Sequence, residues 1–230
     1  MIDDYKDIWV FIELKKDKIR GVSLELLGKA KELALKSNEK VCAVLLGNNL
    51  SKFCEELSNH GIDKIYICEN ELLKEYLLET YSLILVELIK NYMPSILLIP
   101  ATKLGRELAP RIAATVETGL TADCIDLDIQ EGNLIQTRTV YGANYLADII
   151  CPNERPQIAT VRPNVIEKSK VSEKNNPEII QYLVEIEPSQ LKTKIIEKIE
   201  ITTISAKPID EADVIVSGGR GIGSKENFKI

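Results

Sequence analysis

The stretch of this sequence best suited to chemistry is the glycine-rich segment 217–225, which reads SGGRGIGSK. It follows an apolar run at 212–216 that we predict to be a strand. Glycines after a strand let the backbone approach a phosphate, and the start of a following helix adds N–H donors and a positive dipole end. Arg220 can place its guanidinium on a phosphate or on an electron-rich ring edge. Ser224, with Glu226 in the next turn, has the residue type of a helix N-cap. The segment therefore predicts an anion-binding turn.

Three named loop motifs nearly match this segment, and each fails. A P-loop needs its lysine before the serine, whereas here Ser224 precedes Lys225. A dinucleotide fingerprint can start at Gly219 and Gly221, but Ser224 stands in place of its third glycine. A pyrophosphatase-type SGGxDS loop needs an aspartate where Gly221 stands. A tight strand-to-helix turn with a solvated arginine therefore stays open as the alternative interpretation.

Outside this segment, a few polar residues are candidates for a site. Arg106, Arg111, Asp123 and Arg162 could line a nucleotide crevice at the carboxyl edge of a parallel sheet. Ion pairs that hold loops together are the more common role of such residues. His60, the only histidine, has no partner for a metal site or a catalytic triad. Because no nucleophile stands with a base, we expect a chain that makes or breaks no covalent bonds, with no catalytic or metal site.

Composition describes a globular protein with a mildly acidic balance. Of the 230 residues, 45% are hydrophobic and 28% are charged, which is the usual mix for a chain that buries a core. The formal net charge is −6, and lysine and arginine form no dense basic block. Nucleic-acid binding therefore has no support.

The cysteines and the apolar runs bear on the compartment. The five cysteines form no C-x-x-C pair, and their odd number does not suit a disulfide framework. The N-terminus lacks the basic and apolar regions of a signal peptide. No apolar run reaches the length that spans a membrane. We therefore predict a reduced, cytoplasmic protein without membrane insertion or a structural metal.

Short apolar runs alternate with helical periodicity in the first half of the chain. The predicted strands are 8–12, 41–46, 65–68 and 96–99, and the predicted helices are 22–34, 53–57, 73–92 and 105–116. Strands that are apolar on both faces indicate a parallel sheet covered by helices on both sides. The fold class is therefore α/β, with a doubly wound, Rossmann-like sheet. Pro110 predicts a kink or a fresh helix start.

After residue 123 the pattern changes to short β-like runs. We predict added strands, attached to the first fold as a further sheet portion or as hairpins, at 125–129, 134–140, 147–151, 157–161, 179–186 and 195–204. The polar stretch 168–177 is predicted to be a surface loop. The last predicted strand, 212–216, would open a βαβ unit. Such a unit needs about thirty residues, and only a few residues follow this strand. We therefore expect these 230 residues to be part of a longer protein.

Five blocks of the sequence together resemble the alpha subunit of electron transfer flavoproteins. They are, in order, DYKDIWVFIE at 4–13, TKLGRELAPR at 102–111, TGLTADC at 118–124, RPQIATVRP at 155–163 and SGGRG at 217–221. Three positions depart from the family pattern. Lys103 stands where asparagine is frequent, Glu117 interrupts a Gly-Thr-Gly run, and Ala143 replaces a glycine. The departures affect detail near the contact with the beta subunit.

The resemblance implies a heterodimer of this alpha subunit with an electron transfer flavoprotein beta subunit. It implies an adenine-nucleotide alpha-hydrolase-like domain at 1–204 and the start of a C-terminal FAD-binding domain at 205–230. Of the family's FAD contacts, only Gly219, Arg220 and Gly221 carry over, and Arg220 would stabilise the reduced, anionic flavin. FAD would bind in the full-length heterodimer and weakly or not at all to this segment. The electrons would come from an acyl-CoA or related dehydrogenase, as in fatty acid beta-oxidation.

Other functions stay open on the sequence alone. The first block, 4–13, is similar to the clade common in anaerobes, which suggests that the assembly bifurcates electrons. The second interpretation is an adenine-nucleotide-binding module of the universal-stress-protein type. It predicts that added nucleotide raises the melting temperature of the chain. A third possibility is a scaffold that only docks the beta subunit.

Overall fold

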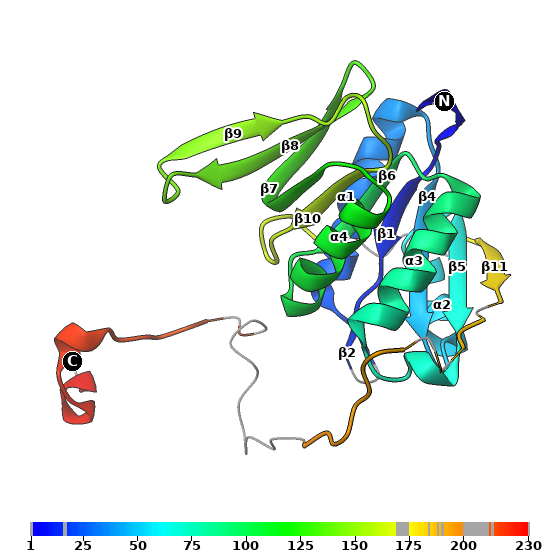
Figure 1. Cartoon of the computed structure of the whole chain (residues 1–230). Helices are drawn as coiled ribbons and strands as arrows, with labels where there is room; N and C mark the ends of the chain where they lie inside the picture. The colour runs from blue at the N-terminus through cyan, green and yellow to red at the C-terminus, as the bar shows by residue number, and fades with distance from the viewer. Residues whose placement is uncertain are drawn as a thin grey trace. The chain divides into compact units, whose positions relative to one another are not determined.

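The computed structural model describes residues 2–15, 18–168, 175–183, 185–187, 189, 191–199, 212 and 214–229 (Figure 1). The chain divides into two compact units, Met1–Lys194 and Ile195–Ile230. The predicted domain boundary between residues 204 and 205 lies outside the described residues. None of the described helices has the length and apolar character needed to cross a membrane.

The described part of the first unit contains one large mixed sheet. Its strand order is β11-β5-β4-β1-β6-β10-β7-β8-β9. The strands are β1 (Ile8–Phe11), β4 (Val41–Gly47), β5 (Lys64–Glu69), β6 (Ile96–Pro100), β7 (Leu120–Gln130), β8 (Asn133–Val140), β9 (Tyr145–Ile149), β10 (Gln157–Val161) and β11 (Glu178–Tyr182). All neighbours pair in parallel except β7–β8 and β8–β9, which are antiparallel. The predicted α/β fold with a doubly wound parallel sheet and added strands is confirmed.

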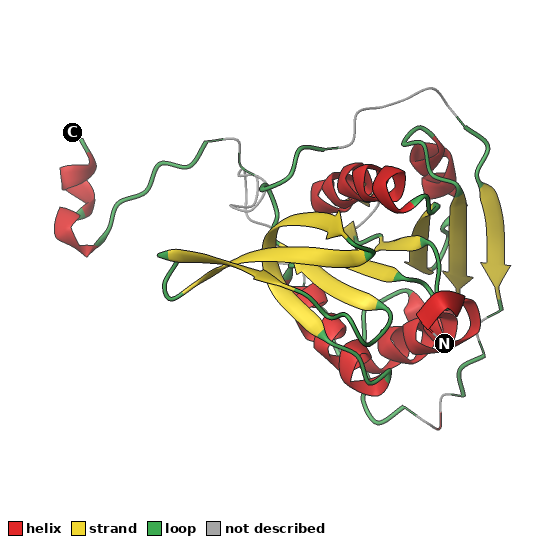
Figure 2. Cartoon of the chain, turned by 90° about the horizontal axis from the view of Figure 1, so that it is seen from above, coloured by secondary structure: helices red, strands yellow, loops and turns green. Residues whose placement is uncertain are grey.

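Helices cover both faces of this sheet (Figure 2). They are α1 (Gly21–Ser37), α2 (Ser51–Ser58), α3 (Leu78–Tyr92) and α4 (Lys103–Thr115). Alternate residues of β1 enter two different cores: Ile8 and Val10 pack with α1 and α2, whereas Trp9 and Phe11 pack with α3 and α4. The parallel strands are continuously apolar because each face meets its own helix layer.

The third helix is shorter than predicted. It begins at Leu78, whereas the sequence predicted a helix from residue 73. Leu73 belongs to a 3-10 turn, Glu71–Leu73, which Asn70 caps by accepting the N–H of Leu72 at 3.0 Å. The hydroxyl of Tyr81 donates to the carbonyl of Leu73 at 3.0 Å. That carbonyl is therefore used by a side chain rather than by a continuing helix.

A fresh helix start at Pro110 is also not observed, since α4 runs through it as one helix. Proline removes the bond that the carbonyl four residues earlier would accept. Both Pro110 and Arg106 are exposed, so water can satisfy the carbonyl of Arg106.

The late strand predictions are only partly confirmed. The run predicted at 179–186 overlaps β11, which begins at Glu178 and ends at Tyr182. No strand is found at the described residues 195–199, 212 or 214–216, and the rest of these two predicted strands lies outside the described residues. A strand needs a neighbour to bond its backbone groups, which an apolar run alone does not supply. The predicted helix after the glycine-rich turn is a four-residue 3-10 turn, Lys225–Phe228.

Candidate functional site

The carboxyl ends of β1 and β6 meet at the topological switch point of the sheet. The chain leaves β1 towards β4 on one side, and β6 pairs with β1 on the other. In open α/β sheets, ligands bind in the crevice outside the strands at this point. A nucleotide-binding module of this fold would hold its ligand here.

Glu13 occupies this crevice. It lies just after β1 and is 5% exposed. Its carboxylate accepts a hydrogen bond from the hydroxyl of Thr102 at 2.5 Å and forms an ion pair with Arg20 at 3.0 Å. Its backbone N–H donates to the hydroxyl of Ser23 at 2.9 Å. One buried side chain thus ties the end of β1 to the starts of α1 and α4.

A phosphate would be disfavoured in this crevice. It would meet the negative charge of Glu13 at short range in a partly desolvated place. The guanidinium of Arg20 and the hydroxyl of Thr102, which could have bound the phosphate, already bind that carboxylate. The geometry therefore counts against the alternative of an adenine-nucleotide-binding module at the switch point.

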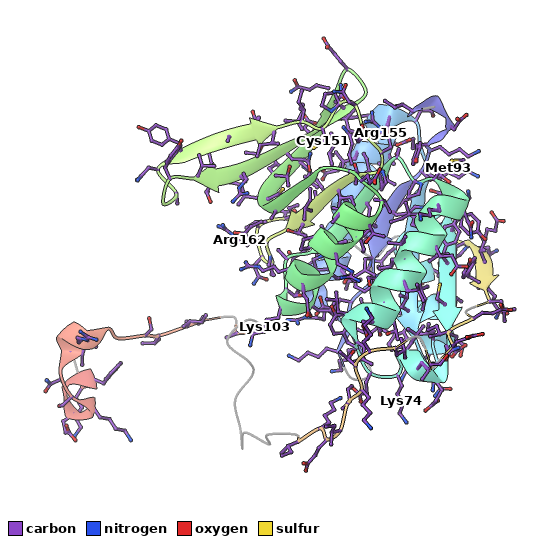
Figure 3. All side chains as sticks on the ribbon, in the orientation of Figure 1. Lys74, Met93, Lys103, Cys151, Arg155 and Arg162 are labelled. Carbon is purple, nitrogen blue, oxygen red and sulfur yellow. The ribbon has the colours of Figure 1, made fainter. Side chains whose placement is uncertain are left out.

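Three of the four predicted crevice residues form a second cluster, beside the first. Asp123 accepts hydrogen bonds from Arg106 at 3.0 Å and from Arg162 at 2.7 Å. Its own N–H donates to the hydroxyl of Thr160 at 2.9 Å, and its φ is 63°. Arg162 lies just beyond β10 (Figure 3). Arg111 is exposed on α4 and has no polar contact with this cluster among the described residues. The cluster fastens α4, β7 and β10 to one another.

The ion pairs shift the titration of Asp123. The hydrogen bond from Arg162 holds the pKa of Asp123 below its ordinary value of 3.8, and burial opposes this. The charges of Arg162, Arg106 and Arg138 lower the pKa further. The pKa of Asp123 is therefore lower in the folded state than in the unfolded state, so the pairing stabilises the folded protein above about pH 4. This stabilisation is lost as pH falls through the folded pKa.

Substitution of Asp123 tests this linkage. We expect Asp123→Asn to lower the free energy of unfolding at neutral pH by at most about 1 kcal/mol, because the pairs are partly exposed to solvent. The difference from the wild type should shrink as pH falls below about 4. Urea unfolding at a series of pH values measures both quantities. A difference that stays constant down to the acid range would contradict the pairing.

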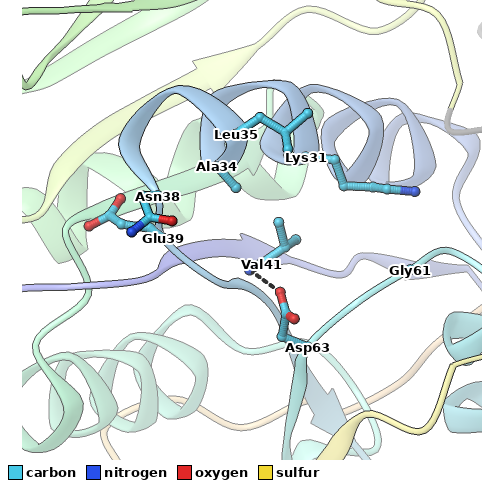
Figure 4. A pocket seen from close by; sticks show the side chains of 8 residues that line it. All are labelled: Lys31, Ala34, Leu35, Asn38, Glu39, Val41, Gly61 and Asp63. Carbon is cyan, nitrogen blue, oxygen red and sulfur yellow. Dashed lines mark hydrogen bonds between the residues drawn. The ribbon is translucent and has the colours of Figure 1, made fainter.

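A hollow of about 330 Å³ lies at the opposite, amino edge of the sheet (Figure 4). It is lined by Lys31, Ala34, Leu35, Asn38, Glu39, Val41, Gly61 and Asp63. Asp63 accepts the N–H of Val41 at 2.8 Å, and Glu39 accepts the hydroxyls of Ser37 and Ser95 at 3.1 and 2.9 Å. Its carboxylates are therefore used in holding the local backbone and neighbouring side chains.

His60, the only histidine of the chain, lies near this edge. It is 5% exposed, although its sequence neighbours are polar, and burial lowers its pKa. Among the described residues, no three histidine, cysteine or acidic side chains are grouped so that they could hold a metal.

The glycine-rich segment belongs to the second unit, where all of its residues except the half-buried Ile222 are exposed. Arg220–Ile222 form a 3-10 turn that the bond from the N–H of Ile222 to the carbonyl of Gly219 closes at 3.1 Å. A Cβ added at Gly219 or Gly221 would meet nothing within 4 Å. The backbone on either side of Arg220 is therefore accessible to a ligand within this unit.

Comparison with known proteins decides the family. The sequence profile of the electron transfer flavoprotein domain matches residues 8–186. The chain is 44% identical to the electron transfer flavoprotein subunit alpha of Thermoanaerobacterium thermosaccharolyticum, over 100% of this chain and 69% of that protein. The chain belongs to the electron transfer flavoprotein family. The predicted resemblance to its alpha subunit is confirmed, and electron transfer by a flavoprotein is the function of this family.

Two further relatives of this flavoprotein chain are informative. The alpha subunit of Clostridium acetobutylicum is 44% identical over 98% of this chain and 68% of that protein. The lactate dehydrogenase (NAD(+),ferredoxin) subunit LctC of Acetobacterium woodii is 37% identical over 98% of this chain and 54% of that protein. Both are named as parts of multi-subunit assemblies, so the predicted role as an electron carrier subunit agrees with them.

The sequence prediction missed two residues that shape the flavoprotein's switch point, Glu13 and Thr102. Each lies two residues after the end of a buried strand, β1 or β6, and polar residues at the carboxyl ends of parallel strands meet at one edge. Their position just after a buried strand was the signal by which the sequence could have indicated them. Only the order of the strands indicates that these two ends are neighbours.

Proposed function

We propose that this chain is part of the alpha subunit of a heterodimer that carries electrons between an acyl-CoA or related dehydrogenase and an acceptor. The observation that carries the proposal is the exposed segment Gly219–Arg220–Gly221 in a member of a flavoprotein family. The alignment with the Thermoanaerobacterium alpha subunit extends over the whole chain and so includes this segment.

The residues of this segment suit an FAD. Gly219 and Gly221 leave the backbone open for close approach, and Arg220 supplies a delocalised cation between them. When bound, the flavin accepts electrons and passes them on, and nearby protein charges set its potential. Arg220 would attract the negative charge that the cofactor gains on reduction.

Arg220 provides the test. We expect Arg220→Gln in the full-length heterodimer to lower the two-electron midpoint potential of the bound flavin by about 30 mV, the equivalent of a tenfold loss of binding to the fully reduced form. Potentiometric titration measures the potential, and the absorbance ratio of flavin to protein measures the occupancy. Lys225→Gln removes the same charge from the same segment and should leave both values close to the wild type. Unchanged potential and occupancy in Arg220→Gln would contradict the role of Arg220.

We further propose that the beta subunit covers the arm formed by β8 and β9, which extends from the sheet (Figure 1). Large apolar side chains are exposed on this arm: Tyr141, Tyr145 and Leu146 are 82%, 66% and 65% exposed. The rings of Tyr141 and Tyr145 lie 6.1 Å apart, edge to face. A two-stranded arm with an apolar surface has little stability alone in water. Apolar patches of this kind mark protein–protein contacts.

We also propose that the assembly bifurcates electrons. The name of the LctC relative includes both NAD(+) and ferredoxin, which supports this for the present chain. Counting flavins in the purified full-length heterodimer, together with an assay for reduction by NADH, tests the proposal. A heterodimer with a single FAD and no reaction with NADH would refute bifurcation, while the simple carrier function would stand.

A further inference from the structure

Buried polar atoms without hydrogen-bond partners gather at the base of the arm. Among the described residues, such side-chain atoms are Nδ1 of His60, Oδ1 of Asn175 and four atoms on β7 and β8. The four are Oγ1 of Thr121, Oε1 and Nε2 of Gln136, and Nε of Arg138. Native proteins rarely leave such atoms unpaired, and each instance calls for an explanation.

Strand register places these residues on one face of the sheet. Gln136 stands opposite Leu127, and Arg138 stands opposite Cys124. Directly opposite residues of an antiparallel pair share a face, and Leu127 and Cys124 both belong to the core under α1. Thr121 joins them, because its partner on β10, Ala159, is in the same core.

Arg138 is the charged member of this group. It stands opposite Cys124, the residue that follows Asp123, and its charge lowers the pKa of Asp123. Arg106 and Arg162 form ion pairs with that carboxylate. Arg138 has no ion pair in the part of the chain that the structure describes. Asp123 therefore pairs with two of the three guanidinium groups near it, and the half-buried guanidinium of Arg138 is left without an ion pair among the described residues.

The same face continues onto the arm. Arg138 pairs with Ala147 of β9, and Val140 pairs with Tyr145. Side chains two residues apart on a strand share a face, so Arg138, Val140, Tyr145 and Ala147 lie together. A protein that buries Tyr145 on this face would also remove water from Arg138. A guanidinium stripped of water is strongly disfavoured unless a carboxylate pairs with it.

We propose that Arg138 receives an aspartate or glutamate carboxylate from the subunit that covers the arm. The covering surface would thus have an apolar groove for Tyr145 and an acidic side chain beside it. Arg138 would act as a specificity-determining residue, because a partner without that carboxylate would leave a buried charge unpaired. This inference rests on the proposed contact between the arm and the beta subunit.

Arg138→Met in the full-length subunit tests the proposal with two measurements. The subunit alone should become more stable, whereas its affinity for the beta subunit should fall. In the subunit alone, loss of an unpaired, half-buried charge should raise the melting temperature by about 2–4 °C. In the heterodimer, loss of the new ion pair should raise the dissociation constant by about 30-fold or more. Arg111→Met removes an equal charge from an exposed position on α4 and should change neither value appreciably.

Two outcomes would overturn the proposal. One is an unchanged dissociation constant for Arg138→Met. The other is a lower melting temperature of the subunit alone, which would mean that Arg138 already has a partner within it. Tyr145→Ser separates this failure from that of the proposed interface. If Tyr145→Ser weakens the heterodimer and Arg138→Met does not, only the carboxylate is refuted. If neither weakens it, the arm is not the interface and both proposals fail.

Discussion

Gly105→Ala is expected to destabilise the protein by about 3 kcal/mol or to prevent its folding. Gly105 lies in the first turn of α4, where its N–H donates to the hydroxyl of the N-cap, Thr102, at 3.1 Å. A Cβ at this position would lie 1.8 Å from the carbonyl oxygen of Pro100 and 3.0 Å from Cγ2 of Ile99. The first of these neighbours is backbone at the end of a central strand and cannot move aside. The helix would have to shift away from β6, and the contact of Thr102 with Glu13 would be lost.

Thermal and urea unfolding of the purified chain measure this effect. Gly21→Ala is the matched control, because Gly21 also lies at the start of a helix. The nearest atom to a Cβ there is the flexible end of Lys168, at 3.0 Å, which can move. We expect this control to be neutral within about 0.5 kcal/mol. Equal stability of Gly105→Ala and the wild type would show that α4 can retreat from the sheet at no cost.

Glu13→Ala is expected to lower the free energy of unfolding by about 3–5 kcal/mol. Removal of the carboxylate takes an ion-pair partner from Arg20 and an acceptor from Thr102 in a place where little water can replace it. Glu13→Gln keeps the shape and one acceptor, so it should lose less. The energy is measured by urea unfolding at neutral pH.

Glu107→Ala is the control for this change. Glu107 is exposed on α4, where it accepts the hydroxyl of Tyr76 at 3.2 Å. Its loss should cost no more than about 0.5 kcal/mol. If Glu13→Ala unfolds like this control, Glu13 does not tie the central strand to the two helices. Addition of ATP or AMP to Glu13→Ala gives a further readout, since nucleotide-dependent stabilisation would show that the carboxylate alone keeps nucleotide out.

Much of the first unit could be predicted because its signals are local. These signals depend only on residues close together in the sequence. They are the apolar runs of β1, β4, β5 and β6 and the helical repeat of α1. The predictions at 195–199 and 214–216 failed where the same signal had no neighbouring strand among the described residues. The helix predicted from residue 73 failed because a side chain, that of Tyr81, took a carbonyl that periodicity had assigned to the helix.

The sequence by itself determined the alternation of strands and helices, the two apolar faces of the sheet and the glycine-flanked position of Arg220, because these depend on residue type and short spacing. Tertiary structure decided that β10 enters the sheet between β6 and β7, and therefore that Asp123 meets Arg162 from 39 residues away. It also decided that Glu13 fills the switch point and that Arg138 has no ion pair in the described part of the chain. Contacts between distant residues depend on strand order and register, which local periodicity does not specify.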